Sequence, residues 1–101
     1  MEDGKALVVT NRLQVPEAYA ARLEQGFAHS TRMEGVPGCL GFEFLRREEG
    51  GEYLVVTRWT DRAAYDAWRE SDAFQRAHAH TNPDSPVQSE LAIYEVLLHQ
   101  P

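Results

Sequence analysis

Two segments of the chain alternate as β-strands do but carry apolar side chains on both faces, which limits the possible folds. In residues 53–60, Leu54 and Val56 lie on one face. The other face of that segment receives mostly aromatic and β-branched residues: Tyr53, Val55, Thr57 and Trp59. Residues 91–98 repeat this two-sided pattern. Strands of this kind are typical of a sheet that is covered on both faces.

Two further segments complete the expected sheet. Residues 6–13 alternate, and one face receives Leu7, Val9, Asn11 and Leu13. Residues 39–46 place three large apolar side chains on one face: Leu40, Phe42 and Phe44. Residues 48–51, Glu-Glu-Gly-Gly, form a turn that predicts a hairpin between 39–46 and the strand at 53–60.

Helices are expected between these strands. Pro16 suits a first helical turn, and an apolar residue at every fourth position from Tyr19 predicts a helix to about Met33, ended by Gly35–Gly38. Thr60 or Asp61 caps a second helix over 62–70. Asp72 begins a third over 73–80, and residues 81–89 are a polar loop.

The order βαββααβ predicts a single ferredoxin-like α+β domain over residues 1–101, with an antiparallel sheet. Helices cover one face of such a sheet. The apolar residues of the other face need a cover, and a second copy of the sheet is the simplest one. We therefore expect a homodimer with the two sheets facing each other.

The composition excludes several functions. A net charge of −6 over 101 residues argues against nucleic-acid binding. No apolar run approaches the roughly 20 residues that span a bilayer, so we expect no membrane association. The acidic start and the single cysteine, Cys39, fit a reducing compartment, and the expected location is the cytoplasm.

Asn11 and His78 are the two polar residues that suggest a site. Asn11 belongs to an apolar face, where an unsatisfied amide costs about 1–3 kcal/mol, so it bonds either the backbone or a ligand. His78 shares a helix flank with Phe74, whereas His80 points about 200° away around the helix. One imidazole fits haem iron better than zinc, although a histidine there also caps a helix end. Trp68 fits a core position.

Three stretches together resemble a known family. They are Asn11–Leu13, the Gly-Val-Pro-Gly-Cys-Leu-Gly-Phe run at 35–42, and residues 68–80 with Trp68 and His78. The second is similar to the antibiotic biosynthesis monooxygenase superfamily, whose members are dimeric ferredoxin-like domains. The first and third resemble its haem-degrading branch of the IsdG and MhuD type.

The resemblance implies a site of Asn11, Trp68 and His78, with Phe27 in the pocket wall. His78 would bind the haem iron, Asn11 would lie on the side where oxygen binds, and Trp68 would press on the porphyrin. Haem is then both substrate and oxygen-activating cofactor, O2 is the oxidant, and an external electron donor or reductase is needed. Relatives often carry arginines where this chain has Gly26 and Ser30.

Two alternatives stay open. A cofactor-independent monooxygenase acting on an aromatic polyketide or quinol shares the fold but does not need the histidine. A non-enzymatic haem-binding or haem-sensing protein would use His78 equally well. Haem degradation is the function that the three stretches favour.

Overall fold

The chain folds around one four-stranded antiparallel sheet of strand order β2-β3-β1-β4. The structure is a computed structural model that describes residues 5–28, 33, 35–71 and 87–100. The strands are β1 (Leu7–Gln14), β2 (Cys39–Arg46), β3 (Glu52–Trp59) and β4 (Gln88–Glu95). With the two described helices, this arrangement confirms the expected ferredoxin-like α+β fold.

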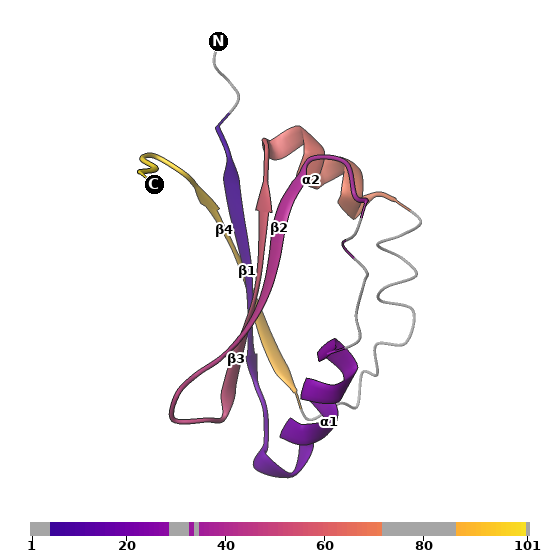
Figure 1. Cartoon of the computed structure of the whole chain (residues 1–101), viewed down its shortest axis with the longest axis vertical. Coiled ribbons are helices and arrows are strands. Elements are labelled where there is room, and N and C mark those ends of the chain that lie inside the picture. The colour runs from indigo at the N-terminus through magenta and orange to yellow at the C-terminus, as the bar shows by residue number, and fades with distance from the viewer. Residues whose placement is uncertain (1–4, 29–32, 34, 72–86, 101) are drawn as a thin grey trace.

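Both described helices lie on the same side of the sheet, near opposite ends of it (Figure 1). Helix α1 (Glu17–Ala28) follows β1, and α2 (Arg62–Arg69) follows β3. The carboxylate of Asp61 accepts a hydrogen bond from the Ala64 backbone N–H at 2.9 Å, so Asp61 is the residue that caps α2. The expected helix over 73–80 lies outside the described residues. In the described part of the chain, neither helix has the length and apolar character that crossing a membrane requires.

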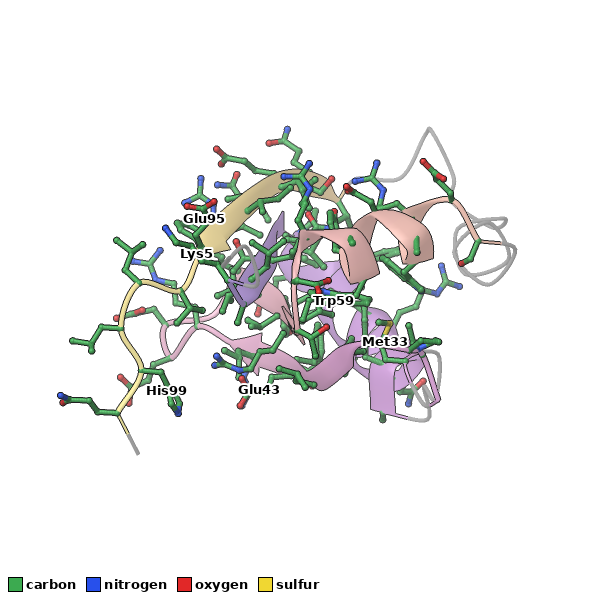
Figure 2. The ribbon with its side chains drawn as sticks, turned by 90° about the horizontal axis from the view of Figure 1, so that it is seen from above. Lys5, Met33, Glu43, Trp59, Glu95 and His99 are labelled. Carbon is green, nitrogen blue, oxygen red and sulfur yellow. The ribbon has the colours of Figure 1, made fainter. Side chains whose placement is uncertain are left out.

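The apolar core is divided into two clusters rather than being continuous. The cluster beside α2 contains Leu7, Val9, Trp59 and Tyr65, with Trp68 and Met33 packed against it. The cluster beside α1 contains Leu13, Val15 and Tyr53, with Tyr19 and Leu23 packed against it. Trp59 is fully buried between the strands and α2 (Figure 2). A small domain usually has one contiguous core, so the division marks the middle of this face.

The first helix follows its apolar repeat over the residues that the structure describes. Helix α1 covers Glu17–Ala28, residues 29–32 lie outside the described residues, and Met33 lies in a turn. The carbonyl of Met33 accepts a hydrogen bond from the Val36 N–H at 3.4 Å, and Gly35 has a φ of +74°. A glycine with a positive φ is typical of the segment that follows a helix end.

Two strand predictions also need correction. A bulge between Cys39 and Gly41 breaks the alternation, so Leu40 is 63% exposed rather than aligned with Phe42. Strand β4 covers Gln88–Glu95 and not 91–98, because residues 88 and 89 pair with the end of β1 although their side chains are polar. Beyond the hydrogen bond from the Val96 N–H to the Ala6 carbonyl, Leu97 and Leu98 extend past the sheet and are exposed.

The face of the sheet opposite the helices is apolar at its centre and charged toward its edges. Val8, Thr10 and Leu54 are half-buried there, and Val56 is buried. Two ion pairs flank them, Arg12 with Glu90 at 2.7 Å and Arg58 with Glu43 at 3.6 Å. Tyr94 on this face is 56% exposed.

Gly38 directly precedes β2 and lies against α2, so it tests how this helix packs on the sheet. It has a φ of +80°, and an added Cβ would overlap the Cβ of Ala64 in α2. We expect Gly38→Ala to lower the free energy of unfolding by more than about 2 kcal/mol, because strain and overlap add. Gly50→Ala is the matched control, since Gly50 has a φ of +85° and no atom near its added Cβ. Equal losses for both variants in urea titrations would contradict this packing.

Candidate functional site

The pairing register places Asn11 in a row of four side chains on the helix-covered face. Asn11 pairs with Leu91 of β4 and with Val55 of β3, and Val55 pairs in turn with Phe44 of β2. Directly paired residues of antiparallel strands point to the same face. We call the side chains of Leu91, Asn11, Val55 and Phe44 the Asn11 row.

On the two inner strands, β1 and β3, the Asn11 row is less covered than the rows on either side of it. Toward α2, Val9 and Thr57 are 5% and 7% exposed. Toward α1, Leu13 and Tyr53 are 7% and 2% exposed. In the row itself Asn11, Val55 and Phe44 are only half-buried, and Leu91 is 51% exposed. The middle of the face thus offers accessible apolar surface around one amide, which confirms Asn11 as the polar residue of an apolar face.

Trp68 lies on the α2 side of the helix-covered face, packed against the cluster that contains Val9 and Trp59. Its ring centroid lies 5.5 Å from that of Trp59 and 6.4 Å from that of Tyr65. The indole N–H of Trp59 donates to the Thr57 hydroxyl at 2.8 Å, which fixes the ring that supports Trp68. The Trp68 carbonyl accepts from the Ser71 backbone N–H at 3.0 Å and from the Ser71 hydroxyl at 2.6 Å. Trp68 is therefore fixed at both its ring and its backbone.

Phe27 lies over the other end of the Asn11 row. Its ring stacks on Phe44 with centroids 4.2 Å apart and planes 10° apart, and it lies 6.3 Å from the ring of Phe42. Phe44 stacks in turn on Tyr53, with centroids 5.2 Å apart. The sequence predicts Phe27 as a pocket wall, and the structure places it beside the same row as Asn11.

A carboxylate ties α1 to the sheet below Phe27. Glu24 accepts a hydrogen bond from the Tyr53 phenol at 2.5 Å and one from Arg46 at 3.0 Å. The Tyr53 hydrogen bond, followed by that of Arg46, lowers the pKa of Glu24. The same bond to Glu24 is the main reason that the pKa of Tyr53 is raised. Both shifts favour a protonated phenol facing an ionised carboxylate.

The remaining predicted site residues lie partly outside the described chain. His78 and Ser30 are among the residues that the structure does not describe. Gly26 is exposed on α1, and an added Cβ would meet no atom within 4 Å. In the described ranges, no three His, Cys, Asp or Glu side chains gather as a metal site. His99 is exposed on the C-terminal tail (Figure 2).

Comparison with known proteins identifies the family. Residues 6–80 match the family model described as antibiotic biosynthesis monooxygenase. This chain belongs to that family.

Within this monooxygenase family, the chain is similar to haem-degrading members. It is 35% identical over 94 residues to a heme oxygenase (mycobilin-producing) of Mycobacterium tuberculosis, covering 91% of this chain and 90% of the relative. A heme-degrading monooxygenase of Bacillus thuringiensis is 28% identical over 95 residues, with 89% of each chain covered. These relatives confirm the resemblance to the haem-degrading branch.

A solved structure gives the same result for the fold. The structure of the heme-degrader MhuD from Mycobacterium tuberculosis, with two hemes bound in its active site, superposes with a TM-score of 0.77. It is 35% identical, and the match covers 94% of this chain and 99% of MhuD. A similar monooxygenase from Bacillus cereus, 20% identical with a TM-score of 0.76, shares the fold.

Several residues around Asn11 were not predicted from the sequence. Alternation shows which face a residue occupies but not which residue lies opposite it, so Leu91, Val55 and Phe44 could not be assigned to one row. Glu24 carries a weak signal, because it precedes Phe27 by three helical positions and shares its flank. Thr57 is a polar residue on an apolar face, as Asn11 is, and that is the signal that singles it out.

Proposed function

We propose that this chain is a haem-degrading monooxygenase that binds haem against the Asn11 row. The observation that carries the proposal is the partly accessible Asn11 row on the helix-covered face, with one amide among apolar side chains. The similarity to haem-degrading relatives supports it over most of the chain.

The residues present fit a porphyrin. A flat, largely apolar ring needs accessible apolar surface with few polar groups, as small-molecule sites generally do. Val55, Leu91 and the stacked rings of Phe27 and Phe44 supply that surface. Trp59 and Tyr53 are buried on the two sides of the row, so the surface between them is firmly supported.

Each proposed site residue has one task. We propose that His78 binds the haem iron through a ring nitrogen, which would fix the ring's height above the sheet. The Asn11 amide would donate a hydrogen bond toward the dioxygen substrate. Trp68, held by Trp59 and Ser71, presses on the porphyrin, and Phe27 encloses its edge.

Haem is the substrate, and when bound it also supplies the iron that activates O2. The chain orients the ring, excludes water from one face and places the Asn11 amide. Electrons come from an external reductant or reductase. We propose that the protein works in the cytoplasm, consistent with its single cysteine.

We also propose that two copies associate through the sheet faces opposite the helices. Val8, Leu54 and Val56 form an apolar centre on that face. Its flanking ion pairs, Arg12 with Glu90 and Arg58 with Glu43, are made within one chain. A second copy can therefore cover the apolar centre without leaving these charges unpaired.

Haemin titration followed by reduction tests the catalytic proposal. We expect a saturable change in the Soret band, then loss of that band when ascorbate is added in air with catalase present.

His78→Ala should weaken haemin binding by more than about tenfold, because it removes the iron ligand. Asn11→Ala should still bind haemin but lose its Soret band on the order of 100-fold more slowly, because a positioned donor is gone.

His99→Ala is the matched histidine control, since His99 is exposed on the tail, and it should behave as wild type. An unchanged Soret band in the wild-type titration would overturn the haem proposal and favour the quinol or polyketide alternative. A band that forms but persists under reductant would indicate a haem-binding or sensing protein. Binding by His78→Ala that equals wild type would reassign the ligand.

Light-scattering mass tests the dimer. We expect wild type to have about twice the 11.5 kDa of one chain. Leu54→Lys should shift the mass toward one chain, because it places an unpaired charge in the apolar centre. Ala63→Lys, on an exposed position of α2, is the control and should leave the mass unchanged. A wild-type monomer, or a Leu54→Lys dimer as stable as wild type, would contradict the interface.

A further inference from the structure

We infer that Glu24 and Tyr53 act as a positioning pair that holds α1 so that Phe27 lies over the Asn11 row. The contacts form a closed ring. Glu24 bonds Tyr53, Tyr53 stacks on Phe44, Phe44 stacks on Phe27, and Phe27 lies three residues after Glu24 on the same helix. The effect of the Glu24–Tyr53 pair on haem binding rests on the proposed function, whereas its effect on the position of α1 does not.

Helix α1 needs such a tie because its packing alone is weak. None of its residues from Glu17 to Ala28 is buried. It contacts the sheet through half-buried side chains such as Tyr19, Leu23 and Phe27. Gly26, one residue before Phe27, further weakens the helix there. A strong hydrogen bond therefore has more influence on this helix than on a well-packed one.

Tyr53 is the more rigidly held partner in its hydrogen bond with Glu24. Its side chain is 2% exposed, and its ring is held against Phe44 with planes 3° apart. The phenol reaches Glu24 at 2.5 Å, and a hydrogen bond to a charged acceptor is stronger than one between neutral groups. Arg46 adds a second bond to Glu24, but its side chain is 63% exposed, so solvent screens that ion pair.

The geometry predicts which side chains move when the Glu24–Tyr53 hydrogen bond is lost. Residues three apart on a helix lie on the same flank, so fixing Glu24 also fixes the height of Phe27 along the sheet. Phe44, the ring under Phe27, belongs to the Asn11 row. Loss of the Tyr53 hydroxyl should release the ring of Phe27 from this row while leaving the α2 side, with Trp68 and Trp59, unchanged.

Hydrogen exchange tests the placement of α1 without haem. In Tyr53→Phe, which keeps the ring, we expect the amides of residues 21–28 to exchange about tenfold faster than in wild type. The amides of 62–69 in α2 should be unchanged. Glu24→Ala should speed exchange of the α1 amides in the same way. Glu24→Gln should stay close to wild type, because an amide oxygen still accepts from the phenol. Wild-type exchange of α1 in Tyr53→Phe would overturn the inference.

A double-mutant cycle on haemin affinity tests the action through Phe27. Tyr53→Phe should weaken haemin binding by about tenfold in the wild-type background, measured where every variant is folded. In the Phe27→Ala background the same change should weaken binding less than about twofold. Glu49→Gln, which disturbs an exposed ion pair with Arg47, is the matched control and should match wild type.

The outcomes separate the two proposals. Equal effects of Tyr53→Phe in both backgrounds would show that the pair does not act through Phe27, and would overturn that step. If wild type binds no haemin, the proposed function is wrong, and hydrogen exchange alone decides whether the pair positions α1. If wild type binds haemin and Tyr53→Phe binds it equally well, the positioning pair is wrong and the proposed function stands.

Discussion

The hydrogen-bonding requirement of one amide shapes the centre of this molecule. Asn11 lies on β1, one of the two inner strands of the sheet, on the face that both helices cover, where the neighbouring rows contain buried side chains. The amide coincides with the division between the two clusters of the apolar core, and the Asn11 row stays partly accessible. A ligand that is largely apolar and carries one polar centre meets both requirements.

Polar side chains on the two sides of the row hold its aromatic walls in place. On the α2 side, the Thr57 hydroxyl fixes the indole of Trp59, and Trp59 supports Trp68. On the α1 side, Glu24 fixes the phenol of Tyr53, and the stack through Phe44 leads to Phe27. Such support is what a site needs if it is to hold a flat ligand in one orientation.

The sequence predicts the fold well because alternation and turn residues are local signals. The strands, the Asp61 cap and the glycine turns follow from the side chains at those positions. The errors arise where pairing with distant residues decides the outcome. The Leu40 bulge, and the start of β4 at Gln88 among polar residues, depend on what β3 and β1 present.

The candidate site is predicted only in part, for the same reason. Asn11, Trp68 and Phe27 are identified by a family resemblance, and their faces by alternation, but no local pattern gives the register that joins Asn11 to Val55 and Phe44. Glu24 and Tyr53 are 29 residues apart in sequence, and only the folded sheet brings them into contact. His78 remains a prediction from the sequence, since it lies outside the described residues.

The central claim is that the ligand surface is the Asn11 row and not the opposite face of the sheet. Nuclear magnetic resonance of isotope-labelled protein, titrated with diamagnetic gallium protoporphyrin IX, measures this most directly. The account predicts that the side-chain amide signals of Asn11 shift, together with the methyl signals of Val55 and Leu91, while the methyl signals of Thr10 and Val56, which lie on the opposite face, move little. Unchanged Asn11 amide signals, with shifts confined to Thr10 and Val56, would contradict it.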